Sequence, residues 1–194
     1  MKKKVTILTV LLISFLNVIA QTNSGIWNSK TATYINGKYY VEWSLPNELT
    51  WIGRPILVEN TKFKVRNYDT NILVSLNIFS NSGPISDIWE YENEIKESVI
   101  SEAKMTAGMH DMQYRWVKCE RKKIRGINAL RTIFDISKYY PETNSTFHSI
   151  EYSYHIIYKN FVYSVNVLAI SINETDIKDF YPIAEYIIDG FNFK

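Results

Sequence analysis

The sequence predicts an α+β fold in which an antiparallel sheet of about six or more strands is covered by helices, an α/β/α sandwich. Long segments rich in β-branched and aromatic residues follow one another through residues 112–170, and the connections between them are too short for parallel crossovers. A three-four spacing of apolar residues interrupts the strands near residues 85–103, and a second helical pattern closes the chain. Helices packed on an antiparallel sheet bury both kinds of pattern.

Residues 1–20 have the pattern of a signal peptide. Lysines occupy positions 2–4, residues 5–19 are an uncharged apolar stretch, and Ala20 provides the small residue at a cleavage site. The alternative is a membrane anchor, but about 15 apolar residues are fewer than the ~20 that span a bilayer. We therefore expect cleavage near Ala20, export to the periplasm or the extracellular space, and a single domain over residues 21–194.

Removal of the signal peptide would change the charge of the chain. The full sequence carries a formal charge of +2, and losing three lysines and no acidic residue would bring it to −1. Overall charge therefore gives no support to a nucleic-acid partner. Cys119 is the only cysteine, so an exported chain would have no internal disulfide, and we interpret Cys119 as a small buried strand residue rather than a reactive thiol.

The N-terminal half is predicted to start with a hairpin and to continue with strands. Thr31 to Trp43 alternates like two strands, and Asn36-Gly37 supplies the residues that favour a type I′ turn. Weaker strands are predicted at residues 51–58 and 62–68, and a clear strand at 72–79.

An amphipathic helix of about 20 residues is predicted after the turn signal at residues 81–84. Ser86 or Asp87 can cap its start, and Gly108 is expected to end it. Its apolar positions are Ile85, Ile88, Trp89, Ile95, Val99 and Ala103. We interpret its charged positions as a solvated face.

Four long strands are predicted at residues 112–124, 127–137, 147–158 and 161–170, with tight turns at Arg125-Gly126 and Lys159-Asn160.

The C-terminal segment is predicted to form a helix and then a short strand. Residues 176–181 can form one helical turn, and Pro182 is expected at the first position of the next helical segment, where its missing N–H costs nothing. Gly190 would terminate that helix, and Phe191 and Phe193 alternate as in a final strand that covers the core.

Four segments, taken in order, resemble the PsbP-like superfamily, which includes PsbP of photosystem II, the Ran-binding Mog import factors and the bacterial DcrB-like exported proteins. They are WSLPNELTW (43–51), RGINALRTIFDI (125–136), YKNFVYSVNVLAI (158–170) and FYPIAEYIIDGFNF (180–193). The resemblance covers nearly all of residues 21–194, with Gly190 where the family often has serine. It implies an α/β/α sandwich and a non-enzymatic docking or accessory role. The residues with which PsbP and Mog engage their partners have no match here.

Patterns typical of catalysis or metal binding are not recognisable in the sequence. The three histidines form no His-x-His or His-Glu-x-x-His motif, and no nucleophile elbow, phosphate-binding glycine loop or calcium loop is present. His148 and His155 are seven apart on a predicted strand, so we expect them on opposite faces. The sequence therefore predicts no catalytic residue, no metal site and no cofactor.

One hairpin concentrates positive charge and is the candidate binding surface. An acidic partner protein or anionic lipid headgroups could dock there; the alternative is a soluble hairpin tip whose charges discourage edge pairing. The candidate binding residues are Arg121, Lys122, Lys123, Arg125, Arg131, Tyr139 and Tyr140.

The function expected from these observations is that of an exported, non-catalytic binding or accessory module of the bacterial cell envelope. Its partner would be an envelope protein or a small ligand, with peripheral contact to an anionic membrane surface as a further option and no nucleic acid. Two alternatives stay open: a hydrolase with an unrecognised active site, and a structural envelope component.

Overall fold

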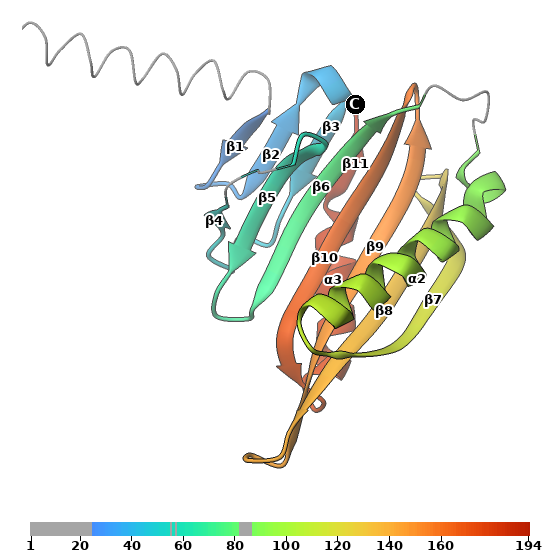
Figure 1. Cartoon of the computed structure of the whole chain (residues 1–194). Coiled ribbons are helices and arrows are strands. Elements are labelled where there is room, and N and C mark those ends of the chain that lie inside the picture. The colour runs from blue at the N-terminus through green and yellow to red at the C-terminus, as the bar shows by residue number, and fades with distance from the viewer. Residues whose placement is uncertain (1–24, 55, 57, 82–86) are drawn as a thin grey trace, which may run out of the picture.

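The computed structural model describes residues 25–54, 56, 58–81 and 87–194. The predicted signal peptide and its cleavage site, most of the turn signal at residues 81–84, and Ser86 as a helix cap lie outside the described residues. The described residues form two antiparallel sheets and two α-helices (Figure 1). The predicted α+β class, with an antiparallel sheet covered by helices, is confirmed.

The large sheet has seven strands in the spatial order β4-β5-β6-β10-β9-β8-β7. These strands are β4 (Ile52–Gly53), β5 (Thr61–Asn67), β6 (Ile72–Ser80), β7 (Gln113–Ile124), β8 (Ile127–Tyr140), β9 (Ser145–Tyr158) and β10 (Phe161–Asn173). A small sheet has the order β1-β2-β3-β11, and its strands are β1 (Ile26–Asn28), β2 (Thr33–Asn36), β3 (Val41–Ser44) and β11 (Phe191–Phe193). Every strand pair is antiparallel, as the short connections require.

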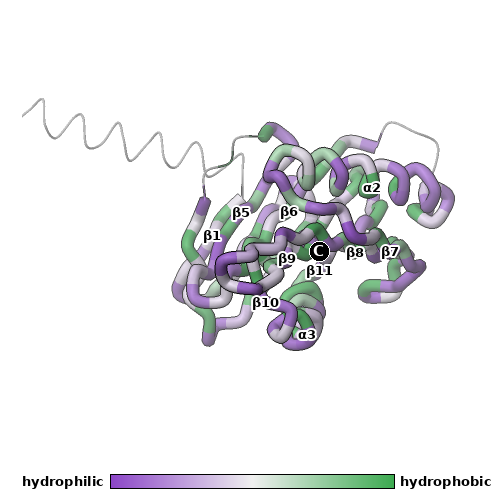
Figure 2. Tube along the Cα trace, turned by 60° about the horizontal axis from the view of Figure 1, so that its bottom comes forward, coloured by the Kyte–Doolittle hydropathy of each residue, from purple (hydrophilic) through white to green (hydrophobic). Residues whose placement is uncertain are grey.

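The helices cover opposite faces of the large sheet (Figure 2). Helix α2 (Glu92–Met109) continues from a 3₁₀ turn, η2 (Ile88–Tyr91), and packs on β7 and β8. Helix α3 (Ile177–Asp189) packs on β10 and β11 on the other side. The small sheet shares this second side, since its side chains form one core cluster with those of α3 and the large sheet. Among the described residues, neither helix combines the length and apolarity needed to cross a bilayer.

Alternation along β10 shows how one strand serves two environments. Tyr163, Val165 and Val167 are fully buried under α3 and the small sheet. The residues between them, Ser164 and Asn166, point to the opposite side, because successive side chains of a strand alternate between faces. We call the side covered by α3 and the small sheet the closed face, and the side that carries α2 the open face.

Aromatic side chains build the closed face. The Trp43 indole is 0% exposed and donates its Nε1–H to the Ile187 carbonyl oxygen at 2.8 Å. The Tyr163 hydroxyl donates to the Tyr39 carbonyl oxygen at 2.8 Å, so this buried polar group is also satisfied. Phe191 packs edge-on against Trp43, which ties the last strand to the third. The predicted covering role of the final strand is confirmed.

The turn predicted at Asn36-Gly37 is wrong in type, although the hairpin exists. Residues 37–39 form a 3₁₀ turn, and Tyr40 instead takes the left-handed conformation, with φ of 55°. Asn36 pairs with Val41, so the connection has four residues rather than two. The longer loop places Tyr39 against Phe161 in the core, and this contact outweighs the local preference of Asn-Gly.

The break predicted at Pro182 is also wrong, because α3 is one continuous helix with Pro182 inside it. Proline removes one helical hydrogen bond, and burial of Phe180, Ala184 and Ile187 against the sheet offsets that loss. Gly190 ends the helix as predicted, but for a different reason. Its φ is −72°, and a Cβ there would lie 1.9 Å from the Ser44 carbonyl oxygen, so close approach rather than a left-handed turn requires glycine.

The other elements agree with the sequence patterns, with shifted ends. Asp87 caps the first helical turn, as its side chain accepts from the Trp89 backbone N–H at 3.0 Å, and α2 passes Gly108 and ends at Met109. Of the strand predicted at residues 51–58, the described residues form the two-residue strand β4, and β8 and β10 are each three residues longer than predicted. Boundaries move because pairing with neighbouring strands extends a strand beyond its own sequence pattern.

Candidate ligand-binding site

The open face carries two adjoining cavities beside α2. Helix α2 packs chiefly on β7 and β8, and the sheet is hollowed between residues 95–102 of this helix and the neighbouring strands β9, β10 and β6. A first cavity of about 550 Å³ lies towards the C-terminal end of α2, and a second of about 430 Å³ lies towards its N-terminal end. The two share Glu102 of α2 and Glu151 of β9, which therefore stand at their junction.

Apolar side chains form much of the first cavity. Phe134 and Ile136 come from β8, Phe147 from β9, and Leu168 and Ile170 from β10. Phe134 and Ile136 are buried where α2 packs on β8, whereas Phe147, Leu168 and Ile170 are half-buried. On each strand these positions alternate with residues of the closed face, so strand periodicity places them on the cavity side. His110, Lys138 and Tyr140 add polar groups to its lining.

The second cavity is lined mainly by small polar side chains of β6 and β10. The Ser164 hydroxyl donates to Asn166 Oδ1 at 2.7 Å, and Asn166 Nδ2 donates to Ser75 Oγ at 3.3 Å. The Thr61 hydroxyl donates to Asn77 Oδ1 at 2.7 Å. The polar groups are thus held in place by one another, as in a preformed binding surface.

The junction of the cavities is acidic. Burial raises the pKa of Glu151 to about 7, and the neighbouring charge of Glu102 adds to this effect, while a hydrogen bond from the Ser153 hydroxyl at 2.8 Å partly opposes it. Desolvation by its neighbours also raises the pKa of Glu102, although this residue is exposed to solvent on the surface of α2, so the effect on it is the weaker of the two. No cationic side chain in the described part of the chain forms an ion pair with either carboxylate.

His155 lies on the same side of β9 and lines the second cavity. Its Nε2 is 2.8 Å from the Thr132 hydroxyl on β8. Burial lowers its pKa to about 4, so the imidazole is neutral at physiological pH. The open face therefore pairs a neutral histidine with a carboxylic acid that titrates near neutrality.

The two strand histidines point to opposite faces, as predicted. His148 is buried on the closed face, with Nδ1 2.9 Å from Asp135 Oδ1. Its Nε2 is buried without a hydrogen-bond partner. Within the residues that the structure describes, no three His, Cys, Asp or Glu side chains gather as a metal site would require.

The predicted binding residues do not come together as one surface. Arg121 and Lys123 point to the open side of β7 and Lys122 to the closed side, because they alternate along one strand. Tyr139 and Tyr140 lie at the far end of β8, about 40 Å from the Arg125 turn at ~3.3 Å per residue. The aromatic residues therefore cannot line a groove beside the basic turn.

Most of the basic hairpin residues already have partners within the chain. Arg121 Nε is 2.7 Å from Glu92 Oε2, and its guanidinium lies over the Trp89 ring. Arg125 Nη2 donates to the Asp189 carbonyl oxygen at 2.5 Å. Lys123 is exposed. Intramolecular pairing of this kind leaves less free charge for an acidic partner than the sequence alone indicates.

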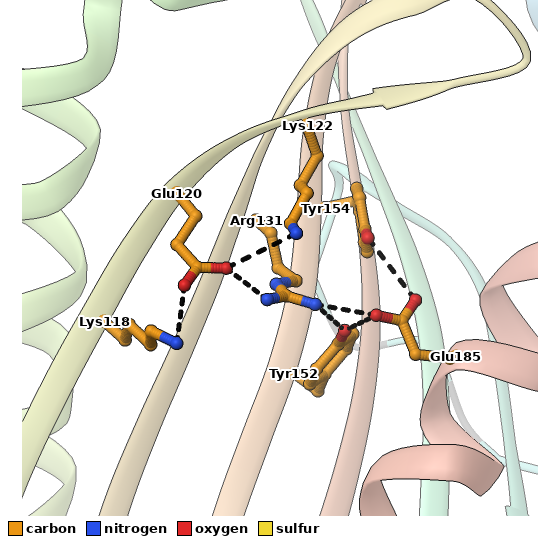
Figure 3. A network of polar contacts seen from close by, with 7 residues as sticks. All are labelled: Lys118, Glu120, Lys122, Arg131, Tyr152, Tyr154 and Glu185. Carbon is orange, nitrogen blue, oxygen red and sulfur yellow. Dashed lines mark hydrogen bonds and ion pairs between the residues drawn. The ribbon is translucent and has the colours of Figure 1, made fainter.

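Arg131 is the centre of a polar network between the sheet and α3 (Figure 3). It contacts Glu120 of β7, and its Nη1 is 2.7 Å from both the Tyr152 hydroxyl and Glu185 Oε1. Glu120 also contacts Lys118 at 2.5 Å, and these cations lower its pKa to about 2. The Arg131 side chain is only 15% exposed, so its contacts indicate a structural role.

The sequence held one signal for the open face. Residues 149–156 alternate strictly between polar side chains and isoleucine or tyrosine, which is typical of a strand with one half-exposed face. That signal could have identified Glu151 and His155 as members of a polar face. Glu102 could not have been assigned to it, since the placement of α2 beside β9 depends on packing.

No protein-family model matches this chain, and no curated protein matches it in sequence. Among solved structures, cyanobacterial PsbP (CyanoP) from Synechocystis sp. PCC 6803 is similar with a TM-score of 0.57 at 11% identity, over 88% of this chain and 96% of that chain. LpqN of Mycobacterium tuberculosis, involved in cell envelope biogenesis, gives 0.46 at 11% identity over 79% and 83% of the two chains. The Ran-binding protein Mog1p of Saccharomyces cerevisiae gives 0.47 at 8% identity over 79% and 90%.

The similarity to CyanoP shows that this chain has the PsbP-like fold, which is the fold that the resemblance of the four sequence segments implied. At 11% identity the similarity concerns the fold alone.

Proposed function

We propose that this chain is an exported accessory protein of the bacterial cell envelope that binds a ligand on its open face and catalyses no reaction. The observation that carries the proposal is the pair of adjoining cavities beside α2, of about 550 and 430 Å³. Ligand pockets typically have volumes of about 300–1,000 Å³ and combine apolar walls with a few fixed polar groups. Both cavities fall in this range; the first has mainly apolar walls, and the polar groups of the second are fixed by the hydrogen bonds described above.

Export is supported by the pattern of residues 1–20. Expression in a bacterial host, followed by intact-mass measurement of the protein recovered from the periplasm or medium, tests it. We expect a chain that begins at Gln21, since Ala20 precedes the expected cleavage site. A mass that retains residues 1–20, recovered with the membrane fraction, would favour an anchor instead.

Filling the first cavity tests the binding function. Leu168 lines this cavity on β10, and Leu168→Trp would place a larger side chain there. In a thermal-shift panel of fatty acids, alkylamines, aromatic acids and sugars, we expect at least one class to raise the Tm of the wild-type chain. The same class should leave the Tm of Leu168→Trp unchanged, because a blocked cavity gives no ligand-dependent stabilisation.

The basic hairpin provides the comparison variant. The triple substitution Arg121→Ser, Lys123→Ser and Arg125→Ser removes the charges near the β7–β8 turn and touches neither cavity. We expect this variant to keep the ligand response of the wild type. If the triple variant loses the response and Leu168→Trp keeps it, the hairpin is the binding surface and the open-face proposal is wrong.

A second candidate function is a hydrolase that uses Glu151 as a general acid. The raised pKa of Glu151 beside a second carboxylate favours it, since paired carboxylates with separated pKa values are common in glycoside and ester hydrolysis. Chromogenic esters and glycosides test this candidate. Turnover by the wild-type chain that disappears in Glu151→Gln would replace the binding function with a hydrolytic one.

A further inference from the structure

The chemistry of the open face changes along its length, and this change restricts the class of ligand. The first cavity is largely apolar, with Phe134, Phe147 and Leu168 in its walls. The second is lined by hydroxyl and amide groups such as Ser164 and Asn166. A ligand that fills both therefore has an apolar arm and a polar part.

The junction of the two cavities also restricts the charge of the ligand. Glu102 and Glu151 line both cavities, and the charge of one raises the pKa of the other. Glu102 is exposed at the mouth of the cavities and Glu151 is half-buried. No side-chain cation of the described chain forms an ion pair with either, so together they repel an anion and attract a cation. A neutral ligand that covered the junction would bury both carboxylates further without supplying a positive charge to pair with them.

We infer that the open face binds an amphipathic organic cation, with its ammonium group at Glu102 and Glu151, its apolar arm in the first cavity and any polar extension in the second. This inference rests on the proposed function and names the ligand class. A primary ammonium can donate three hydrogen bonds, and the carboxylates of Glu102 and Glu151 supply acceptors for them.

Other charged groups around the site leave the acidic pair dominant. In the first cavity, Lys138 is bound to Asp111 at 2.9 Å. In the second, His155 is neutral because burial lowers its pKa to about 4. His110 lines the first cavity and Lys64 the second. Among the described residues that line the cavities, these two are the basic groups left to compete with a ligand for the acidic pair.

The inference predicts a dependence of binding on pH. An ammonium ligand prefers the ionised Glu151, whose pKa in the free protein is raised to about 7. At pH 8 the Glu151 carboxyl is ionised in most of the molecules, whereas at pH 5.5 it is ionised in only a small fraction of them. Affinity for the cation should therefore rise with pH by up to about 30-fold between pH 5.5 and 8.

Three probes with one tail and different heads test the inference: octylammonium, octan-1-ol and octanoate. Isothermal titration calorimetry at pH 8 should show octylammonium binding at least ~10-fold more tightly than octan-1-ol, with octanoate weakest. The double variant Glu102→Gln/Glu151→Gln should lose at least ~10-fold in octylammonium affinity and keep its affinity for octan-1-ol. Glutamine preserves the size of the side chain, so the cavities should retain their shape.

Glu94→Gln is the matched control, since Glu94 is an exposed acid on the same helix, as Glu102 is, but lines neither cavity. Its octylammonium affinity should equal that of the wild type. Equal binding of octylammonium and octan-1-ol, abolished in Leu168→Trp, would overturn the inference and support the open-face function. Absence of binding by all three probes would also overturn it, and the wider thermal-shift panel with Leu168→Trp would then decide the proposed function separately.

Discussion

The two faces of the large sheet are built from the same strands, yet they serve different purposes. On β10, Val165 and Val167 are 0% exposed beneath α3 and the small sheet, whereas Ser164 and Asn166, their neighbours in sequence, are 9% and 6% exposed and line a polar cavity. On β9, Tyr152 belongs to the closed core and Glu151 to the acidic junction. Alternation thus lets one strand hold a core on one side and a binding surface on the other.

The difference between the faces arises from what covers them. The closed face is covered by α3 and by a second sheet, and the two share one aromatic core. In the described part of the chain, the helix on the open face is α2, which packs over β7 and β8 with small residues such as Ala103 and Ala107. One helix cannot cover a sheet of seven strands, so the rest of this face keeps its polar residues and its cavities.

The largest effect should come from the closed face. Trp43→Ala would remove a fully buried indole and its hydrogen bond to the Ile187 carbonyl, and we expect it to lower the free energy of unfolding by about 3–5 kcal/mol. Denaturant unfolding measures the change. Trp116 of β7, which is 38% exposed, is the matched control, and Trp116→Ala should cost under about 1.5 kcal/mol. Equal costs for the two variants would contradict the division into a core face and a surface face.

An intermediate effect should come from the network between the sheet and α3. Arg131→Met would leave Glu120 and Glu185 without their shared cation, and we expect a loss of about 1–3 kcal/mol, less than for a fully buried pair because Glu185 is 38% exposed. The exposed pair of Arg121 with Glu92 supplies the control, and Arg121→Met should change stability by under about 1 kcal/mol. Thermal unfolding of both variants, with the ligand panel repeated, checks whether Arg131 acts in folding or, as predicted from the sequence, in binding.

The smallest effect on stability should come from two titrating groups on the open face, whose contributions change with pH in opposite directions. Glu151 keeps its proton up to about pH 7 in the folded state but loses it near 4.5 when unfolded, so stability falls as pH rises through this window. His155 has its pKa lowered to about 4 in the folded state from 6.5, so stability rises with pH between those values. In the wild type the two contributions largely cancel.

Single variants should separate these contributions. In Glu151→Gln, the free energy of unfolding should rise by about 1–2 kcal/mol between pH 4 and 6.5, because only the His155 contribution remains. In His155→Gln, it should fall by about 1–2 kcal/mol between pH 4.5 and 7, because only the Glu151 contribution remains. Urea unfolding at pH 4, 5.5, 7 and 8 measures both curves. Parallel curves for the wild type and both variants would show that neither group is perturbed by the open face.

Much of the fold was predictable from local patterns. Turn residues such as Arg125-Gly126, both with positive φ, and the alternation in the long strands predicted the meander and its connections. Patterns failed where a distant contact outweighed a local preference. Burial of Tyr39 changed the Asn36-Gly37 turn, and packing of α3 carried the helix through Pro182.

The site was less predictable than the fold. Arg131 looked like one more surface charge of a basic hairpin, because its partner Glu185 is 54 residues away in the sequence and on another element. Glu102 and Glu151 were not recognised as a pair for the same reason. Charge counts along a segment do not show which charges the folded chain neutralises.

The sequence by itself determined the class of the fold and the two-sided character of the strands, since hydrophobic period and turn chemistry are local properties of the chain. Only the tertiary structure decided which side is closed, which cations are paired and which two carboxylates stand together. Those outcomes depend on where α2, α3 and the small sheet pack. Packing of this kind is set by contacts between residues far apart in the sequence, which no local pattern records.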